Sequence, residues 1–162
     1  LVEQGAESLI VDVRGNPGGY ISELEKILDY LLPEGPVFTH KPRWWRETVY
    51  RSDESCIDLP MAAIVNADSY SAAELLAAQL RESVDAPIVG ELTSGKGYSQ
   101  ITFPLINGGG VGLSTATYCT GSGHSLIGEG IVPDVELELD EGAVMGEESD
   151  NQLRAAVELL RK

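Results

Sequence analysis

A serine and a lysine in two separate loops are the residues of this chain whose types could carry out catalysis together. Ser71 follows the apolar run Met61–Asn66 and opens a helical stretch, so unpaired backbone N–H groups and the positive end of the helix dipole would surround its hydroxyl. Lys96 lies between Gly95 and Gly97, after another apolar run. A lysine amine can remove the proton of a serine when desolvation favours the neutral amine. The pair therefore predicts nucleophilic catalysis.

Each of these two residues also has a purely structural interpretation. Ser71 and Glu74 match the S-x-x-E capping box, in which the serine caps a helix and the glutamate bonds back to it. Lys96 can be a surface lysine in a glycine turn, because lysine is rarely buried. For either residue taken alone the structural interpretation is the stronger one, although one serine can serve as both cap and nucleophile.

Gln100 is a third candidate, four residues after Lys96. If this segment is a strand, the even spacing places both side chains on one face, and the Gln100 amide could orient the lysine amine. A polar residue on a half-exposed strand is an equally good interpretation.

The glycine loop at residues 16–19 could supply an oxyanion hole. It follows the apolar run at residues 8–13, and glycines at the end of a buried strand leave backbone N–H groups exposed. One donor would be the amide of Gly18 or Gly19, between which the sequence does not decide, and the other the amide of Ala72. As an isolated motif the loop is only a turn.

The histidines and cysteines form no recognisable site. His40 falls in an expected edge segment and His124 in a glycine-serine loop, and we expect both to be surface residues. Cys56 and Cys119 are far apart and match no metal-binding pattern, so one disulfide and two buried thiols both remain open. No metal and no organic cofactor is expected.

Composition excludes several functional classes. The 162 residues are enough for one domain, and 26 acidic against 11 basic residues give a net charge of −15. Such a charge repels the phosphates of nucleic acids and anionic lipids. No apolar run is long enough to insert into a membrane, and the dispersed acidic residues indicate a solvated surface.

Hydrophobic periodicity predicts an α/β domain with a mixed sheet, because strands alternate with helices. Val37–Arg51 should form a hairpin or an extended arm, and Ser149 or Asp150 should cap the last helix. The expected strands are residues 8–13, 61–66, 86–92, 99–106, 111–119 and 131–139, and the expected helices are residues 21–31, residues 72–83 and a terminal segment after residue 150.

Four ordered segments resemble the Ser-Lys carboxy-terminal processing (tail-specific) peptidases, peptidase family S41. The resemblance implies a ClpP/crotonase-like core with a mixed β-sheet flanked by helices. It implies that residues 1–162 are a single catalytic core without the PDZ and N-terminal parts that family members carry upstream. Tyr70 and Ala73 stand where the family often has alanine and serine. The segments are LIVDVRGNPGG (9–19), IVNADSYSAAE (64–74), IVGELTSGKGYSQ (88–100) and GEGIVPDVEL (128–137).

The same resemblance implies the roles of the site residues. Ser71 would be the nucleophile, Lys96, 25 positions later, the general base, and Gln100 the support of the lysine. Ser69 would make only local hydrogen bonds. The implied reaction is cleavage of a polypeptide, at protein C-terminal regions, through an acyl-enzyme and without a cofactor. The implied location is outside the cytoplasm, in the cell envelope or periplasm.

Two alternatives to an active peptidase remain open. Carriers of apolar ligands share the fold family without catalysis, although the serine, lysine and glutamine together argue against a carrier. A scaffold with a misaligned dyad is the other alternative. The expected partner is a polypeptide substrate, and assembly into a homo-oligomer is left open.

Overall fold

Four parallel strands form one sheet, with two buried apolar strands at its centre. In the computed structural model, which describes residues 2–161, every residue of the two central strands is buried. Central parallel strands are covered on both faces, and this explains why these segments are apolar throughout. The sheet order is β1 (Leu9–Asp12), β4 (Met61–Val65), β5 (Ile88–Gly90) and β8 (Val135–Glu136).

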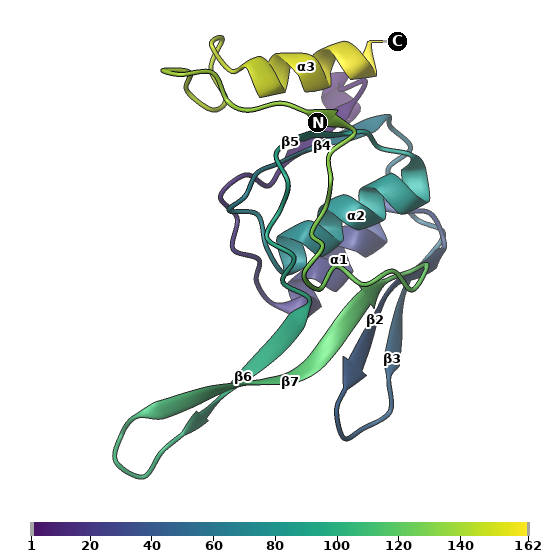
Figure 1. Cartoon of the computed structure of the whole chain (residues 1–162). Helices are drawn as coiled ribbons and strands as arrows, with labels where there is room; N and C mark the ends of the chain where they lie inside the picture. Colours follow the sequence, from purple (N-terminus) through teal and green to yellow (C-terminus); the bar gives the residue numbers. More distant parts are fainter. Residues whose placement is uncertain (1, 162) are drawn as a thin grey trace.

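Helices cover both faces of this sheet (Figure 1). α1 (Ile21–Leu31) and α2 (Ala72–Val84) lie on one face, and α3 (Asn151–Leu160) lies on the other. Strand β4 divides its side chains between two cores, as the two-residue period of a strand requires. Met61, Ala63 and Val65 belong to the core with α1 and α2, whereas Ala62 and Ile64 pack in the core with α3.

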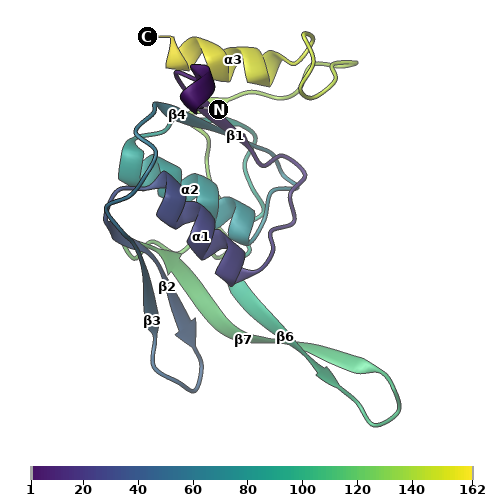
Figure 2. The ribbon, with the colours of Figure 1, turned by 180° about the vertical axis from the view of Figure 1, so that it is seen from behind.

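An antiparallel sheet forms a further layer beyond α1 and α2. Its order is β3 (Thr48–Ser52), β2 (Gly35–Pro42), β7 (Gly110–Thr120) and β6 (Tyr98–Pro104). The far parts of β6 and β7 form an arm that extends away from the helices (Figure 2). Every residue from 100 to 114 is exposed, so the arm has no core of its own.

A buried ion network joins the two ends of the chain. The Arg14 guanidinium, only 1% exposed, contacts Asp12 at 2.6 Å and the fully buried Asp150 at 2.7 Å. Burial alone would raise the pKa of Asp150, but hydrogen bonds from Arg14 and from the Gly146 and Leu153 amides outweigh it and hold this pKa well below its usual range. The network fixes Arg14, two residues before the glycine loop, against the start of α3.

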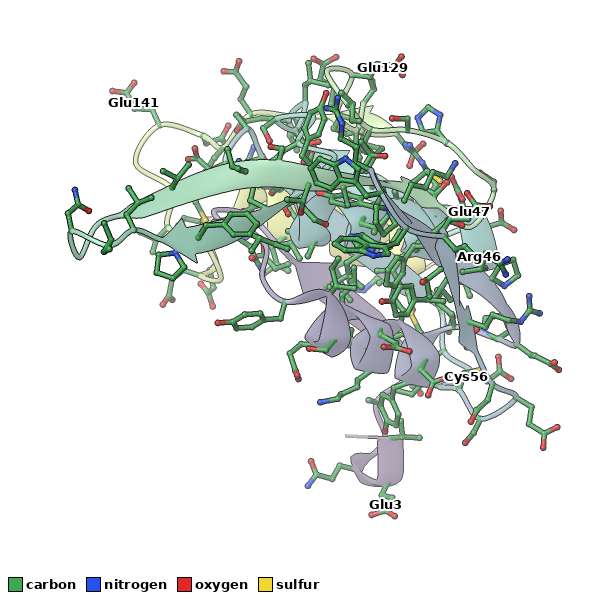
Figure 3. The ribbon with its side chains drawn as sticks, turned by 90° about the horizontal axis from the view of Figure 1, so that it is seen from below. Glu3, Arg46, Glu47, Cys56, Glu129 and Glu141 are labelled. Atoms are coloured by element: carbon green, nitrogen blue, oxygen red, sulfur yellow. The ribbon has the colours of Figure 1, made fainter. Side chains whose placement is uncertain are left out.

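The remaining acidic residues are dispersed. Viewed from below, Glu3, Glu47, Glu129 and Glu141 lie on separate segments around the periphery (Figure 3). All four are exposed, which agrees with the expected solvated surface. No helix within residues 2–161 has the length and apolar character needed to cross a bilayer.

The predicted fold class is confirmed, with the parallel and antiparallel pairings in separate sheets. Asp150 caps α3 by accepting a hydrogen bond from the Leu153 amide at 2.9 Å, as one of the two expected caps. Strands β5 and β8 are shorter than the apolar runs that predicted them, and a short 3-10 helix at Val2–Gln4 was not anticipated. Cys56 and Cys119 are free thiols and not a disulfide; Cys119 is buried, as the thiol alternative expected, whereas Cys56 is only half-buried.

Candidate active site

Ser71 lies at the N-terminus of α2 in a strained backbone conformation. Its φ of 64° and ψ of −126° are unfavourable for a residue with a side chain. The other non-glycine residue with positive φ in the described part of the chain is Asp85, whose left-handed conformation is ordinary at a helix end. Such strain persists only where surrounding structure enforces it, and it clusters at functional sites.

The glycine loop packs directly against this serine. A Cβ on Gly18 would lie 2.8 Å from each of the Ala72 nitrogen, the Ser71 Cβ and the Tyr70 oxygen, so only glycine fits there. The Gly18 amide donates to Asn16 Oδ1 at 2.8 Å. The Gly19 amide makes no hydrogen bond within residues 2–161.

Hydrogen bonds between the loops that follow β1 and β4 hold them together. The Tyr70 amide donates to the Asn16 oxygen at 3.1 Å, and the Gly15 amide donates to Asn66 Oδ1 at 2.8 Å. Ser69 is fully buried, and its hydroxyl donates to the Val13 oxygen at 2.7 Å. The Ser69 hydroxyl also accepts the Asn66 amide at 3.0 Å, so the expected local hydrogen bond is present, but Ser69 additionally joins two segments that are far apart in the chain.

One buried carboxylate connects the serine segment to the lysine segment. Glu74 Oε2 accepts the Ser71 amide at 2.8 Å and the Lys96 amide at 3.0 Å. Its Oε1 accepts the Gly95 amide at 2.7 Å and the Thr93 hydroxyl at 2.5 Å. The capping-box pattern predicted the contact to Ser71, but the contacts to the lysine segment could not be inferred from it.

Tyr118 is a site residue that the sequence did not reveal. Its phenol donates to the backbone oxygen of Lys96. Burial raises the pKa of Tyr118 to about 12, although the neighbouring Ser71 side chain opposes this rise. The phenol is therefore protonated at neutral pH and remains a donor to the lysine loop.

A cavity of about 510 Å³ brings the predicted site residues together. Apolar side chains of α1 and α2 line part of it, including Ile21, Leu24 and Leu75, and residues of β2, β6 and β7 line another part. The cavity therefore lies where the helices meet the antiparallel sheet. Its lining includes Ser71, Lys96, Gln100, Gly18, Gly19 and Ala72.

Lys96 is half-buried and has no acidic partner. Its Nζ lies 5.3 Å from the centre of the Tyr70 ring, and none of the ion pairs among residues 2–161 includes it. The Ser71 hydroxyl and the Lys96 amine, although on one cavity, are not hydrogen-bonded to each other in the described structure.

Gln100 lines the same cavity but from an exposed position. Strand β6 begins at Tyr98, so Lys96 lies in the preceding loop and the even-spacing argument for a shared strand face does not apply. The Gln100 amide nitrogen lies 3.5 Å from Ser114 Oγ.

The expectation that both histidines lie on the surface is wrong for His40. It belongs to β2, which lies between β3 and β7 and is not an edge strand, and it lines the cavity with a buried Nε2. The side chain of His124 is 50% exposed, as expected, and lies 4.0 Å from Glu129. Across residues 2–161, no His, Cys, Asp and Glu side chains gather as ligands for a metal ion.

Two curated relatives of this chain are named as proteases. The chain is 37% identical to a carboxyl-terminal-processing protease of Synechocystis sp., over 99% of this chain and 38% of that protein. It is 36% identical to one of Picosynechococcus sp., over 99% of this chain and 39% of that protein. The chain thus spans about two fifths of the length of these curated relatives.

Solved structures and a family model agree with this similarity. The photosystem II D1 C-terminal processing protease superposes with a TM-score of 0.76 at 29% identity, over 99% of this chain and 40% of that one. The tricorn protease shares the fold, with a TM-score of 0.59 at 23% identity over 96% of this chain and 15% of that one. The model of peptidase family S41 matches residues 1–137, and the chain therefore belongs to that family.

Proposed function

We propose that this chain is the catalytic core of a serine endopeptidase that processes the C-terminal regions of polypeptides. The observation that carries the proposal is the strained Ser71 at a helix N-terminus, on one cavity with Lys96 and the glycine loop. The names of the relatives supply the substrate class, a polypeptide cleaved near its C-terminus.

In the proposed reaction Lys96 is the base and Ser71 the nucleophile. The neutral Lys96 amine takes the proton of the Ser71 hydroxyl while Oγ bonds to the carbonyl carbon of the scissile peptide. The C–N bond then breaks, and the Lys96 ammonium returns the proton to the departing amine. A water molecule, deprotonated by the same amine, hydrolyses the ester and releases Ser71.

The oxyanion of the tetrahedral intermediate needs two N–H donors. We assign these to the amides of Ala72 and Gly19, because the Gly18 amide is already bonded to Asn16. Ala72 is the first residue of α2, where the helix leaves backbone N–H groups unpaired and its dipole favours negative charge. Gly18 is then not a donor. Because it has no side chain, the loop can pack closely against this end of the helix.

Two residues would control the hydrogen bonds of the dyad. Tyr118 lies beside the Ser71 side chain, and the Ser71 hydroxyl is not bonded to the Lys96 amine, so this hydroxyl would turn towards Lys96 when substrate binds. Catalytic hydrogen bonds are often loose without substrate, and this rearrangement is of that kind. Gln100 is proposed as the support of the lysine, because it lines the same cavity and carries no charge that would hold the ammonium.

Cleavage of an unfolded protein tests the proposal. With full-length protein and casein as substrate, Ser71→Ala and Lys96→Ala should each lower the rate by at least about 10³-fold, and the double variant should be no worse, because nucleophile and base act as a unit. Circular dichroism would verify that each variant is folded. The exposed His124→Ala is the matched control and should keep wild-type activity.

Two outcomes would contradict the assignment. Retention of most activity by Lys96→Ala would require a different base. A folded wild-type protein that cleaves no polypeptide would favour a non-catalytic domain, either a scaffold or a binder of apolar ligands.

The location is a separate part of the proposal. Family membership supports a site of action outside the cytoplasm, in the cell envelope or periplasm, and a relative from Tetradesmus obliquus is named as chloroplastic. Fractionation of the native cells with an antibody to this chain tests it. Recovery with cytoplasmic markers alone would contradict it.

A further inference from the structure

Two buried polar atoms in the described part of the chain have no hydrogen-bond partner, and both belong to residues of the catalytic cavity. They are Nε2 of His40 and Oγ of Ser99. A buried polar atom without a partner destabilises the folded state, so folded proteins contain few of them. Since both residues line the cavity that holds Ser71 and Lys96, we infer that a substrate group is the partner that would satisfy these atoms.

Strand pairing places these two residues on one face of the antiparallel sheet. His40 on β2 is opposite Tyr118 on β7, and Ser99 on β6 is opposite Ala116 on β7. Side chains that are directly opposite share a face, and so do residues two apart on one strand. His40 and Ser99 therefore flank β7 on the face that carries Tyr118, and all three residues line the cavity.

His40 and Ser99 form one side of the cavity, which we call the wall, and this wall is polar but uncharged. Burial lowers the pKa of His40 below its usual value, so its imidazole is neutral at neutral pH. A neutral imidazole and a hydroxyl can each donate or accept one hydrogen bond. Other parts of the cavity present the apolar Ile21, Leu24 and Leu75. A side chain with an aliphatic stem and an uncharged hydrogen-bonding end matches both kinds of lining, whereas a charged side chain would find no counter-charge at this wall.

We propose that His40 and Ser99 are specificity residues that bind an uncharged polar side chain, such as that of threonine, asparagine or glutamine, at the substrate position preceding the scissile bond. This inference rests on the proposed peptidase function. It defines the substrate class more narrowly, because an apolar cavity alone would favour purely aliphatic side chains.

Matched threonine and valine peptides test the proposal, because the two side chains have nearly the same shape. A cleavage site would first be mapped by mass spectrometry in casein digested by the full-length protein. Two synthetic peptides of that site would then carry threonine or valine before the scissile bond. Wild type should show kcat/KM about tenfold higher for threonine, the effect of one satisfied buried hydrogen-bonding group.

Three variants test whether His40 and Ser99 cause the preference for the threonine peptide. Ser99→Ala and His40→Phe should each bring the threonine-to-valine ratio of kcat/KM close to one. A loss of overall rate does not affect this ratio, because both peptides are compared on the same variant. Thr39→Val is the matched control: Thr39 neighbours His40 on β2 and is opposite Cys119, so its side chain lies on the other sheet face. This variant should keep the wild-type ratio.

The outcomes separate this inference from the proposed function. Equal cleavage of both peptides by wild type, or an unchanged ratio in Ser99→Ala and His40→Phe, would overturn the inference and leave the peptidase proposal standing. If His40→Phe does not fold, Ser99→Ala decides the matter alone. Absence of Ser71-dependent cleavage of casein and of both peptides would overturn the proposed function itself, and the inference with it.

Discussion

Two regions contribute to the same cavity in different ways. One is the parallel sheet with its helices and connecting loops, which we call the body, and the other is the antiparallel sheet. The body supplies Ser71 and the glycine loop, whose atoms are held by buried hydrogen bonds and by contacts too close for a side chain. The antiparallel sheet supplies His40, Ser99 and Gln100, which have weak bonds or none to their neighbours. The first region leaves its atoms little freedom, and the second leaves groups available to a substrate.

From this difference we infer that the body carries out the proposed reaction and that the antiparallel sheet selects the substrate. Chemistry requires a nucleophile and oxyanion donors in a fixed geometry, so it depends on the body. Selection among substrates requires groups that gain partners on binding, so it depends on the antiparallel sheet. Substitutions in the body should therefore affect rate and stability strongly, and those in the sheet should mainly affect preference.

The largest effect is expected for Gly18→Ala. The added Cβ would be 2.8 Å from the Ala72 nitrogen and the Tyr70 oxygen, and would push the loop with its Gly19 amide away from the Ala72 amide. We expect kcat/KM to fall by about 10³-fold, as for loss of an oxyanion donor. Gly15→Ala is the control, because Gly15 also has a positive φ, of 65°, but open space around it. Equal losses in both variants would show that backbone conformation, and not close packing, limits the loop.

Asp150→Asn should be the most destabilising change outside the cavity. It leaves the buried Arg14 without its fully buried partner, so the free energy of unfolding should fall by about 3 kcal/mol at pH 7 in denaturant titrations. Glu23→Gln removes an ion pair whose partners are 71% and 59% exposed, and should cost at most about 0.5 kcal/mol. Similar losses in the two variants would contradict the special role of the buried network.

The difference in unfolding free energy between wild type and Asp150→Asn should depend on pH. The pKa of Asp150 is depressed in the folded protein, so the stabilisation it contributes is complete above the ordinary carboxylate pKa of about 3.9 and is lost as the pH falls below that value. The difference in stability between wild type and Asp150→Asn should therefore narrow from pH 7 to pH 3. A difference that widens on acidification would contradict the depressed pKa.

Glu74→Gln tests whether one carboxylate aligns the dyad. The amide has a single oxygen, and its NH₂ group would face backbone N–H groups that now donate to the carboxylate. We expect kcat/KM to fall by about 10²-fold, because small displacements of Ser71 and Lys96 are costly. Glu82→Gln makes the same chemical change at an exposed position of the same helix and should have little effect. Full activity of Glu74→Gln would show that the loops keep their alignment without it.

The smallest effect concerns the strain at Ser71. Glycine tolerates a φ of 64° that alanine does not, so Ser71→Gly should unfold with a free energy about 1 kcal/mol higher than Ser71→Ala. At Ser22, an exposed position within α1, the order should reverse, because glycine is a poorer helix former by about 1 kcal/mol. The same order at both positions would mean that Ser71 is not strained.

Much of the body could be predicted because its signals are local. The apolar period of residues 21–31 gave the helix that the structure has, and the run at residues 61–66 gave β4. The apolar run at residues 131–139 predicted a longer strand than the structure has. Only Val135–Glu136 pair with β5, and the other residues of the run belong to no strand. An apolar run predicts that a segment is buried. Whether the segment pairs as a strand depends on its position relative to the edge of the sheet.

The side of the cavity formed by the antiparallel sheet could not be predicted, because strand register decides it. His40 had no spaced partner in the sequence, and its position opposite Tyr118 follows from pairing between strands far apart in the chain. The contacts of Glu74 with the lysine loop likewise join segments about twenty residues apart. A local motif such as the capping box shows one partner of such a residue and not the others.

Covalent labelling with a fluorophosphonate tests the Ser71–Lys96 assignment most directly, because a serine that is activated as a nucleophile displaces fluoride from the reagent and forms a phosphonate ester. Treated full-length protein would be digested and the modified residue identified by mass spectrometry. The account predicts a single label on Ser71, its loss in Lys96→Ala, and its retention in the exposed control His124→Ala. A label on Ser69 or another serine, or undiminished labelling of Ser71 in Lys96→Ala, would contradict it.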